Sequence, residues 1–384
     1  MGGLVGHMKH IYDYDDMQIC DLVAMLKDIN NNRCDLYEKI DGFNLNIGLS
    51  MAGQIIVARN KGDLNLKSGG MTEAELAEKY QDKPDVYKVF KTAIDILRPY
   101  LKILEVGHFW SAYAATGLGP RYMLNVECVM EGCTNLIHYP VKKVFIHNLS
   151  EIRADGNGEW GFCGNKELPD DMVKSMEPFI DICTDYKVRL ESTDIPFATE
   201  LTRFFGSYRT IAGYKWARFV EWMNREMPEL MDPILVPALY SFIICGNGTR
   251  RHLKELCNKY TYDSLIILLD NRATECKRYI MDPIIDFFAD LEYRMLKHVE
   301  DSFNQAYYNT SVEYLYVDLL NVVNWIATNS NKYAYIADKL SKVGGKLLPI
   351  EGIVLNWRGK TVKLTGTFVY LTRILGDYKY RKDK

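Results

Sequence analysis

The chain has 384 residues, too many for one small domain and about right for two or three. Hydrophobic residues make up 48% and charged residues 25% of the sequence, which excludes an intrinsically disordered chain. The 47 basic and 50 acidic residues give a net charge of −3, which excludes a globally basic nucleic-acid coat but allows a local basic groove.

The cysteines and the apolar runs indicate a compartment. Nine cysteines are scattered without a C-x-x-C pair, which is typical of reduced thiols and not of a disulfide framework or a zinc knuckle. The N-terminus lacks a secretory apolar segment, and the longest uncharged run, Pro233 to Thr249, is too short and too polar at its end to span a bilayer. We therefore expect a cytoplasmic protein without a membrane partner.

The first 150 residues combine helical and strand patterns. Helical spacing or a capping box predicts helices over Gln18 to Ile29, from Thr72 onward and over Phe90 to Leu101. Alternating or β-branched residues predict strands over Tyr37 to Ser50, Gln54 to Arg59, Tyr122 to Met130 and Val141 to Leu149. Met51-Ala52-Gly53 predicts a hairpin between the first two strands.

The pattern changes after Leu149. Residues 155 to 170 are rich in Gly, Asp and Asn and predict a loop or linker. Helical periodicity then prevails from about Pro169 to Val343, before strands return at Gly352 to Asn356 and Thr361 to Thr365. Within this block we expect helices at Arg218 to Met227, Pro237 to Ile244, Tyr279 to Val299 and Tyr314 to Ala327. We predict an α+β fold in which segments 1–150 and 346–384 bracket a mostly α-helical insertion or second domain, 151–345.

The most informative stretch is Glu38-Lys39-Ile40-Asp41-Gly42-Phe43-Asn44. Lys-x-Asp-Gly is the nucleophile motif of covalent nucleotidyltransferases, because a neutral amine can attack the α-phosphate of a nucleotide and form a phosphoramidate. A lysine is protonated at pH 7, so a reactive Lys39 has to lie near other cations or in a desolvated pocket. Gly42 would let the backbone approach the sugar and phosphates. An exposed Lys–Asp pair on an amphipathic strand would give the same four-residue motif. The residues downstream therefore decide between a nucleophile and a structural pair.

Those residues occur in a matching order. Glu127 lies within an apolar strand, where an unbonded carboxylate costs several kcal/mol, so it is expected to bind a sugar hydroxyl or a cation. The other members of the ordered set are Arg59, Phe145, Glu351, Lys360 and Lys363. Taken singly they also fit a core phenylalanine, paired structural carboxylates and edge-strand lysines that deter aggregation.

The ordered set resembles the covalent nucleotidyltransferase superfamily of DNA ligases, RNA ligases and mRNA capping enzymes. The run Glu-Lys-Ile-Asp-Gly-x-Asn is most similar to nick-sealing RNA ligases, the RNA ligase 2 and RNA-editing type, over about Gly6 to Leu149 and Leu347 to Gly376. A fainter similarity, in Gly6-His7-Met8-x-His10 and Lys363-Leu364-Thr365-Gly366-x-Phe368, is to uncharacterised ligase-like proteins of tailed bacteriophages, which would place the protein in the host cytoplasm.

The resemblance implies a ligase-type nucleotidyltransferase domain that uses ATP with Mg²⁺ or Mn²⁺. Lys39 would take AMP, with Asp41 and Lys363 as further catalytic residues, and Glu351 would help to place the metal ion. Arg59 would contact the phosphates or the ribose, Asn44 the sugar, Glu127 the ribose hydroxyls, and Phe145 the adenine ring. The full set of implied cofactor-binding residues is Glu38, Gly42, Asn44, Arg59, Glu127, Phe145 and Lys360.

Two departures from the family pattern are informative. The last motif usually has two lysines two residues apart, whereas Lys360 and Lys363 are three apart and so lie on opposite faces of a strand, which favours Lys363. Only 21 residues follow Lys363, too few for the OB-fold of DNA ligases and capping enzymes, so we expect no such domain. The helical block would then grip the substrate, with Arg250, Arg251 and Lys254 as possible nucleic-acid contacts or a solvated charged face.

We therefore expect an ATP-dependent polynucleotide ligase, with RNA favoured. It would form a lysyl-AMP intermediate, pass AMP to a 5′-phosphate end and seal that end to a 3′-hydroxyl. The alternatives are a nucleotidyltransferase that modifies a non-nucleic-acid acceptor, a DNA-joining ligase, and a catalytically decayed ligase-fold binding module.

Overall fold

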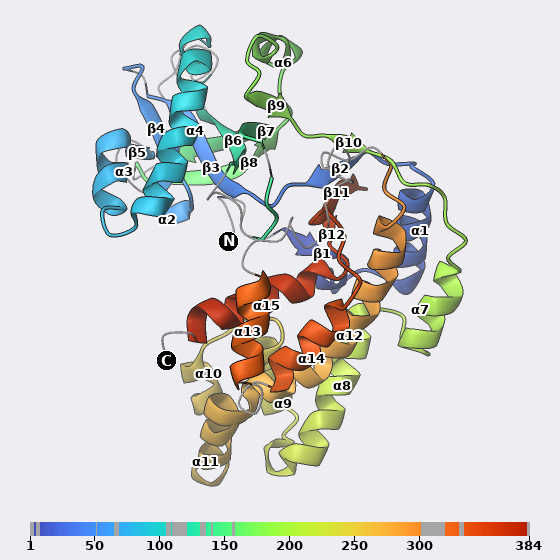
Figure 1. The fold of residues 1–384 in the computed structure, drawn as a ribbon. Coiled ribbons are helices and arrows are strands. Elements are labelled where there is room, and N and C mark those ends of the chain that lie inside the picture. Colours follow the sequence, from blue (N-terminus) through green and yellow to red (C-terminus); the bar gives the residue numbers. More distant parts are fainter. Residues whose placement is uncertain are drawn as a thin grey trace. The chain divides into compact units, whose positions relative to one another are not determined.

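A computed structural model of the chain describes residues 4, 8–50, 52–64, 69–104, 109, 121–130, 136–139, 141–155, 158–300, 319–329 and 334–381. The chain forms two compact units, each with its own elements (Figure 1). The first unit contains residues 1–8, 35–189 and 299–384, and the second contains residues 9–34 and 190–298. Gly6, His7, Met51 and the first five residues of the helix expected at 314–327 lie outside the described residues.

The larger sheet of the first unit has, among the described residues, seven strands in the order β5–β4–β3–β6–β7–β8, with β9 beside β7. Every pairing in it is antiparallel except that of β7 with β9. The strands are β3 (Phe43–Leu49), β4 (Ile55–Ala58), β5 (Met71–Thr72), β6 (Arg121–Val129), β7 (Lys143–Ala154), β8 (Trp160–Lys166) and β9 (Ile182–Thr184).

This sheet has one apolar and one polar face, because successive side chains of a strand point to opposite sides. The apolar face joins a buried cluster that includes Leu45, Val126 and Ile146, and helix α4 (Pro84–Ile103) packs there with Phe90 and Leu97 in the same cluster (Figure 1). The opposite face presents polar side chains from the three central strands: Asn44, Asn46, Asn125, Glu127 and Asn148.

A second row of strands in the first unit runs β12–β11–β2–β10, again antiparallel. It consists of β2 (Leu36–Lys39), β10 (Lys187–Val188), β11 (Gly352–Trp357) and β12 (Lys360–Leu364). Strand β11 lies between β2 and β12, so residues 313 to 319 positions apart in sequence become neighbours on one sheet. The strands expected at 352–356 and 361–365 are confirmed.

The single strand expected over Tyr37 to Ser50 is wrong. The chain leaves the smaller sheet after Lys39 and enters the larger sheet at Phe43, so Ile40-Asp41-Gly42 is a junction between two sheets. The apolar residues stand at even positions up to Ile40 and at odd positions from Phe43, and this change of phase marks the break. The hairpin after this strand is confirmed as the antiparallel pair β3–β4.

Six further described helices belong to the first unit. Thr72 caps α3 with Glu75 in the expected capping box. A helix at the chain's end follows β12, where the sequence patterns predicted none. These helices are α2 (Lys61–Leu64), α3 (Glu73–Lys79), α6 (Asp170–Met176), α13 (Leu319–Asn329), α14 (Ala334–Val343) and α15 (Phe368–Arg381).

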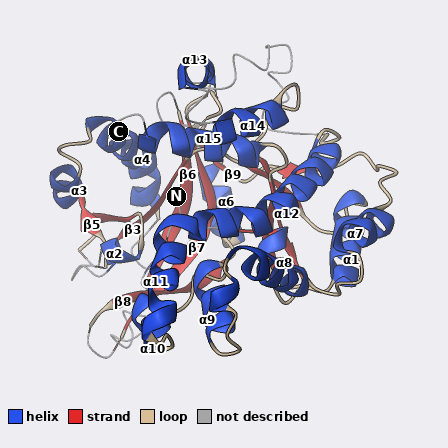
Figure 2. Ribbon diagram, turned by 90° about the horizontal axis from the view of Figure 1, so that it is seen from below, coloured by secondary structure: helices blue, strands red, loops and turns tan. Residues whose placement is uncertain are grey.

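The second unit is almost entirely helical in its regular structure (Figure 2). Its apolar cluster draws on α8, α9, α11 and α12 through side chains such as Trp222, Leu239 and Ile280. Besides β1 (Lys9–His10) and short turns, it contains α1 (Ile19–Asn30), α7 (Phe197–Phe205), α8 (Ile211–Glu226), α9 (Leu235–Ile243), α10 (Arg250–Glu255), α11 (Lys259–Ile267), a π-helical turn (Leu268–Arg272) and α12 (Ala273–Leu296).

The unit boundaries differ from the predicted domain boundaries at residues 150 and 345. Strand β7 runs on to Ala154, and residues 155–170, expected to be a loop, contain β8, which pairs with β7. Most of β8 is exposed and carries Gly161, Gly164 and Asn165, so its composition is that of a loop. The mixed α+β class with antiparallel sheets is confirmed.

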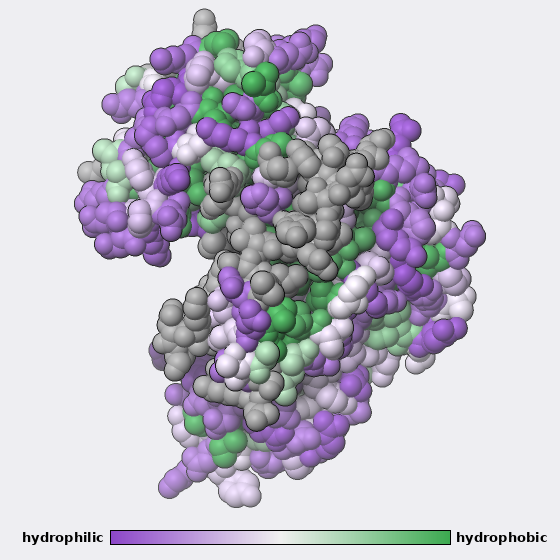
Figure 3. All heavy atoms as spheres, viewed as in Figure 1, coloured by the Kyte–Doolittle hydropathy of each residue, from purple (hydrophilic) through white to green (hydrophobic). Residues whose placement is uncertain are grey.

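The visible described surface is mostly hydrophilic, as the ordinary share of charged residues in the sequence leads one to expect (Figure 3). Hydrophilic residues, drawn in purple, make up most of the visible described surface in Figure 3. Among the described helices, none combines the length and the apolar character that crossing a membrane requires.

Candidate functional site

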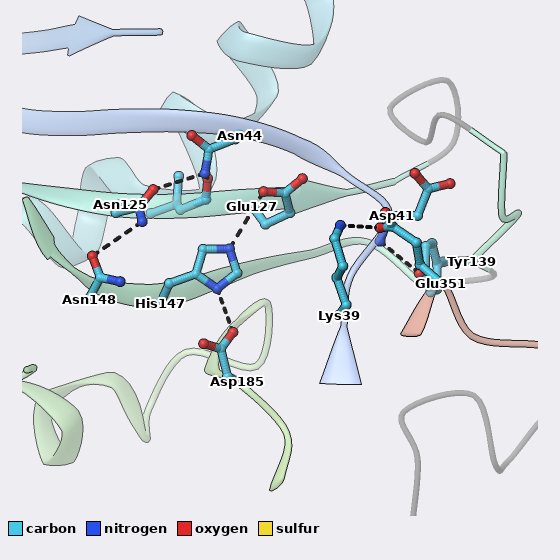
Figure 4. Close-up of polar contacts among 11 residues, drawn as sticks. Lys39, Asp41, Asn44, Asn125, Glu127, Tyr139, His147, Asn148, Asp185 and Glu351 are labelled. Carbon is cyan, nitrogen blue, oxygen red and sulfur yellow. Dashed lines mark hydrogen bonds and ion pairs between the residues drawn. The ribbon is translucent and has the colours of Figure 1, made fainter. Parts of the chain in front are cut away.

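Lys39 and Glu351 form an ion pair at the edge between the two sheets of the first unit (Figure 4). Lys39 is the last residue of β2 and lies opposite Gly352, the first residue of β11, so the preceding Glu351 reaches the same place. The Lys39 Nζ lies 2.5 Å from the Glu351 Oε2. Their side chains are only 21% and 11% exposed, so water screens this pair weakly.

The charges around this pair favour a protonated lysine. Burial acts to lower the pKa of Lys39, but Glu351, followed by Glu127 and Asp41, outweighs burial and raises that pKa. Burial raises the pKa of Glu351 to about 7, and Asp41 and Glu127 add to the rise while Lys39 opposes it. Lys39 thus has one of the two expected surroundings, a mostly buried position, while the neighbouring carboxylates favour its ammonium form.

Two glycines permit the close approach of strands at this edge. Gly352 has φ of 151°, and a Cβ there would collide with the backbone oxygen of Leu364. A Cβ on Gly42 would lie 2.5 Å from the backbone oxygen of Cys128 and 2.8 Å from the Glu127 Cγ. Gly42 is therefore needed where the junction passes over β6, beside Glu127.

Asp41 ties the junction to the segment that follows β6. Its Oδ2 accepts hydrogen bonds from the backbone N–H groups of Leu136, at 2.6 Å, and Ile137, at 2.8 Å. Its own N–H donates to the Tyr139 hydroxyl at 3.0 Å. Burial raises the pKa of Tyr139 well above its ordinary value, so its hydroxyl stays neutral. The carboxylate predicted to be catalytic thus anchors the backbone around Lys39.

Glu127 lies on the polar face of the larger sheet, where it is paired directly with Asn44 on β3 and with Phe145 on β7. Its Oε2 lies 3.5 Å from the His147 Nε2, and the His147 Nδ1 lies 2.5 Å from the Asp185 Oδ1 (Figure 4). The buried Glu127 carboxylate thus has His147 as its partner within the chain, and its binding of a sugar hydroxyl stays a prediction.

An amide chain extends the same face. The Asn44 Nδ2 donates to the Asn125 Oδ1 at 2.9 Å, and the Asn125 Nδ2 donates to the Asn148 Oδ1 at 3.2 Å (Figure 4). Sequence reasoning missed Asn125 and His147, although each stands two residues from Glu127 or Phe145 and so belongs to the same face. Asp185 carried no such signal, because a contact across 38 residues has no local pattern.

The two late lysines lie on opposite faces of β12. Lys363 pairs with Val354, and Val354 pairs with Tyr37, so Lys363 shares the sheet face of Tyr37 and Lys39. Lys360 is three residues away and lies on the other face. Strand spacing puts the Lys363 and Lys39 backbones about 12 Å apart, within reach of two long side chains around one ligand.

Three further residues predicted to bind the cofactor lie apart from the Lys39–Glu351 pair or are packed against other side chains. Glu38 is buried and points to the opposite side of β2 from Lys39. The guanidinium of Arg59 lies 5.6 Å from the ring centres of Phe43 and Phe90. Phe145 lies on the polar face but is fully buried, with the Tyr186 ring 5.6 Å from its own, so a stacked base would have to displace that ring.

The basic residues Arg250, Arg251 and Lys254 belong to α10 in the second unit, and all three have partners there. Arg250 lies 2.6 Å from Asp270, and Arg251 lies 3.0 Å from Glu255 within the same helix. The Lys254 ammonium lies over the Tyr262 ring. These contacts are those of a solvated charged face, the alternative to nucleic-acid binding that the sequence allowed.

A metal ion would have to rely on few protein ligands. Within the described part of the chain, no three His, Cys, Asp or Glu side chains are grouped so that they could hold a metal ion. Mg²⁺ on a nucleotide commonly uses one or two carboxylates, phosphate oxygens and waters, and a single buried carboxylate such as Glu351 fits that pattern.

A scan against models of known protein families, a search of curated proteins and a search of solved structures each return no match to this chain. The residues of the site and their geometry are therefore the grounds on which its function is inferred.

We predict that Gly42→Ala lowers the free energy of unfolding of the first unit by about 1–3 kcal/mol, since the added methyl group has to displace β6. Gly161→Ala in β8 is the matched control, because its Cβ meets nothing within 4 Å, and should change stability by less than about 0.5 kcal/mol. Chemical denaturation of both variants tests this, and equal effects would contradict the close approach at Gly42.

We predict that His147 stays protonated through neutral pH. Burial lowers its pKa, but Asp185 and then Glu127 raise it further, to about 10 from 6.5. Because the folded-state pKa is the higher one, this stabilisation is complete below about pH 6.5 and is lost as the pH rises through about 10. NMR titration, with the signal assigned through His147→Asn, should show no change in this imidazole between pH 5.5 and 8.5; a midpoint near 6.5 would contradict the arrangement.

Proposed function

We propose that this chain is an ATP-dependent nucleotidyltransferase of the polynucleotide ligase type, with Lys39 as the residue that takes AMP. The observation that supports this most strongly is the Lys39–Glu351 pair, which joins two distant motifs of the ordered set at one point. The polar sheet face with Glu127 begins beside it, and Lys363 shares the sheet face of Lys39. A structural Lys–Asp pair on an exposed strand would need none of these neighbours.

The first reaction step needs a neutral amine. Lys39 has to lose one proton before its nitrogen can attack, and the Glu351 carboxylate, 2.5 Å away, is placed to accept that proton. The Lys39 nitrogen then forms a bond to the α-phosphorus of ATP while the bond from that phosphorus to the pyrophosphate oxygen breaks. The products are lysyl-AMP and pyrophosphate, and the proton has passed to Glu351 or to solvent.

The nucleotide would lie along the polar face of the larger sheet. Glu127 would accept hydrogen bonds from the ribose hydroxyls, and Asn44, opposite it on β3, would contact the sugar. Lys363 would offset the charge on the α-phosphate as it builds during transfer. Once the proton from Lys39 has passed on to solvent, the Glu351 carboxylate would hold Mg²⁺ or Mn²⁺, which offsets phosphate charge.

For the acceptor, we propose a 5′-phosphate end of a nucleic acid, with RNA favoured. The 5′-phosphate oxygen would displace Lys39 from AMP, and a 3′-hydroxyl would then displace AMP to form the phosphodiester bond. The support is the likeness of Glu38-Lys39-Ile40-Asp41-Gly42-x-Asn44 to nick-sealing RNA ligases. The proposal assigns the helical second unit to substrate binding.

One observation favours a second candidate, a ligase-fold module that binds nucleotide without reacting. Three carboxylates raise the pKa of Lys39 and so oppose the neutral amine that the chemistry requires. In such a module the Lys39 ammonium would act only as a counter-charge for phosphate. Binding of ATP without covalent labelling would distinguish this module from the enzyme.

We predict that incubation with α-³²P-labelled ATP and magnesium transfers label to the protein, and that Lys39→Ala abolishes the transfer. Glu351→Gln should slow labelling by about 100-fold or more, because it removes the proton acceptor. Lys102→Ala, at an exposed lysine of α4, is the matched control and should label normally. Labelling that persists in Lys39→Ala would exclude Lys39 as the nucleophile.

The acceptor is tested with the labelled enzyme after removal of ATP. Transfer of label to nicked, single-stranded or hairpin RNA with a 5′-phosphate is expected, with less transfer to the DNA equivalents. Label that stays on the protein with every nucleic acid would favour a non-nucleic-acid acceptor.

A further inference from the structure

His147 is the extra residue of a β-bulge in β7. The pairing with β6 runs from Ile146 opposite Val126 to Asn148 opposite Asn125, and His147 falls between these two pairs. A bulge changes the direction of the side chain that it carries and disrupts the regular hydrogen bonds between the strands, and bulges are common beside active sites. Here it directs the imidazole toward Glu127.

The other partner of His147 is carried by a segment that spans both sheets. Asp185 follows β9, which pairs with β7 of the larger sheet, and precedes β10, which pairs with β2 of the smaller one. Next to it, the Tyr186 backbone oxygen accepts the N–H of Glu38 at 2.9 Å. Asp185 is therefore fixed relative to β2, the strand that ends at Lys39.

The three side chains form a line from this segment to the candidate ribose site. Asp185 lies 2.5 Å from one imidazole nitrogen, and Glu127 lies 3.5 Å from the other. A protonated imidazole donates through both nitrogens and accepts through neither, so it can hold a carboxylate on each side. One Glu127 oxygen is then occupied, and the carboxylate retains lone pairs for a hydroxyl donor.

We propose that His147 is a positioning residue that, braced by Asp185, orients the Glu127 carboxylate to accept the ribose hydroxyls of the bound nucleotide. This inference rests on the proposed function, because Glu127 is assigned to the ribose there. It assigns a role to two residues, His147 and Asp185, that are not members of the ordered sequence set. Loss of either should weaken recognition of the ribose hydroxyls and leave recognition of the phosphates intact.

The test compares ATP with 2′-deoxy-ATP. Dissociation constants for both nucleotides are measured by calorimetry in EDTA, and labelling with magnesium is measured in parallel, for the unaltered protein, Glu127→Gln and His147→Asn. The unaltered protein should prefer ATP by about tenfold or more, as expected for one hydrogen bond to a charged group. Both variants should lose most of that preference, while their affinity for 2′-deoxy-ATP changes less than threefold.

Two further variants control the result. Asp185→Asn keeps the size of the Asp185 side chain but removes its charge, and should lose part of the preference for ATP over 2′-deoxy-ATP. This variant also provides the test if His147→Asn does not fold. His252→Asn removes an exposed histidine of the second unit and should keep the full preference. A structural defect alone would weaken both nucleotides equally.

The outcomes separate the inference from the proposed function. A preference for ATP that survives in both His147→Asn and Asp185→Asn overturns the inference, as does an unaltered protein that binds both nucleotides equally. If the preference is present and His147-dependent but no label is transferred, the positioning role stands and the transferase proposal fails. If neither nucleotide binds, both fail.

Discussion

The ammonium group of Lys39 interacts with three carboxylates, those of Glu351, Glu127 and Asp41, and it is the direct counter-charge of the buried Glu351. Glu351 shows the cost of such burial, since its pKa is raised to about 7 even with the ammonium 2.5 Å away. Without that cation the carboxylate would have to take up a proton or draw in water. Asp41 is stabilised differently, by two backbone N–H groups. The site thus holds its charges through specific partners instead of exposure to solvent.

Directly after Lys39, the chain passes from one sheet to the other within three residues. Lys39 ends β2 and Phe43 begins β3, and Gly42 between them touches the backbone of β6 more closely than any side chain would allow. On the other side of the pair, Gly352 lets Glu351 turn toward β2 at the start of β11. The two motifs to which the proposal assigns the chemistry therefore also contain the glycines that permit the close approach of neighbouring strands.

Features that depend on period-two alternation could be read from the sequence, and features that depend on distant segments could not. The opposite faces of Lys360 and Lys363 followed from their spacing. Glu127 was expected to need a partner, but Asp185, which completes its line of contacts, is 58 residues away. The break at Ile40-Asp41-Gly42 was missed although the apolar positions change there from even to odd numbers. Strand β8 was missed because an exposed edge strand can have the composition of a loop. The role of Asp41 as an anchor depends on backbone N–H groups, which no side-chain pattern reports.

The two glutamates of the site have separate cations, and this separation gives them different behaviour during the proposed reaction. Glu351 is paired with Lys39, whereas Glu127 is paired with His147. When Lys39 gives up its proton and becomes bonded to AMP, Glu351 loses its counter-charge and becomes available to a metal ion or a proton. Glu127 keeps its imidazolium throughout, because the charge on His147 is held by Asp185 and not by the reacting group. The hydrogen bonds from the ribose to Glu127 would then stay constant while the charge at the phosphate changes. A site that binds, transfers and releases one nucleotide in sequence requires this.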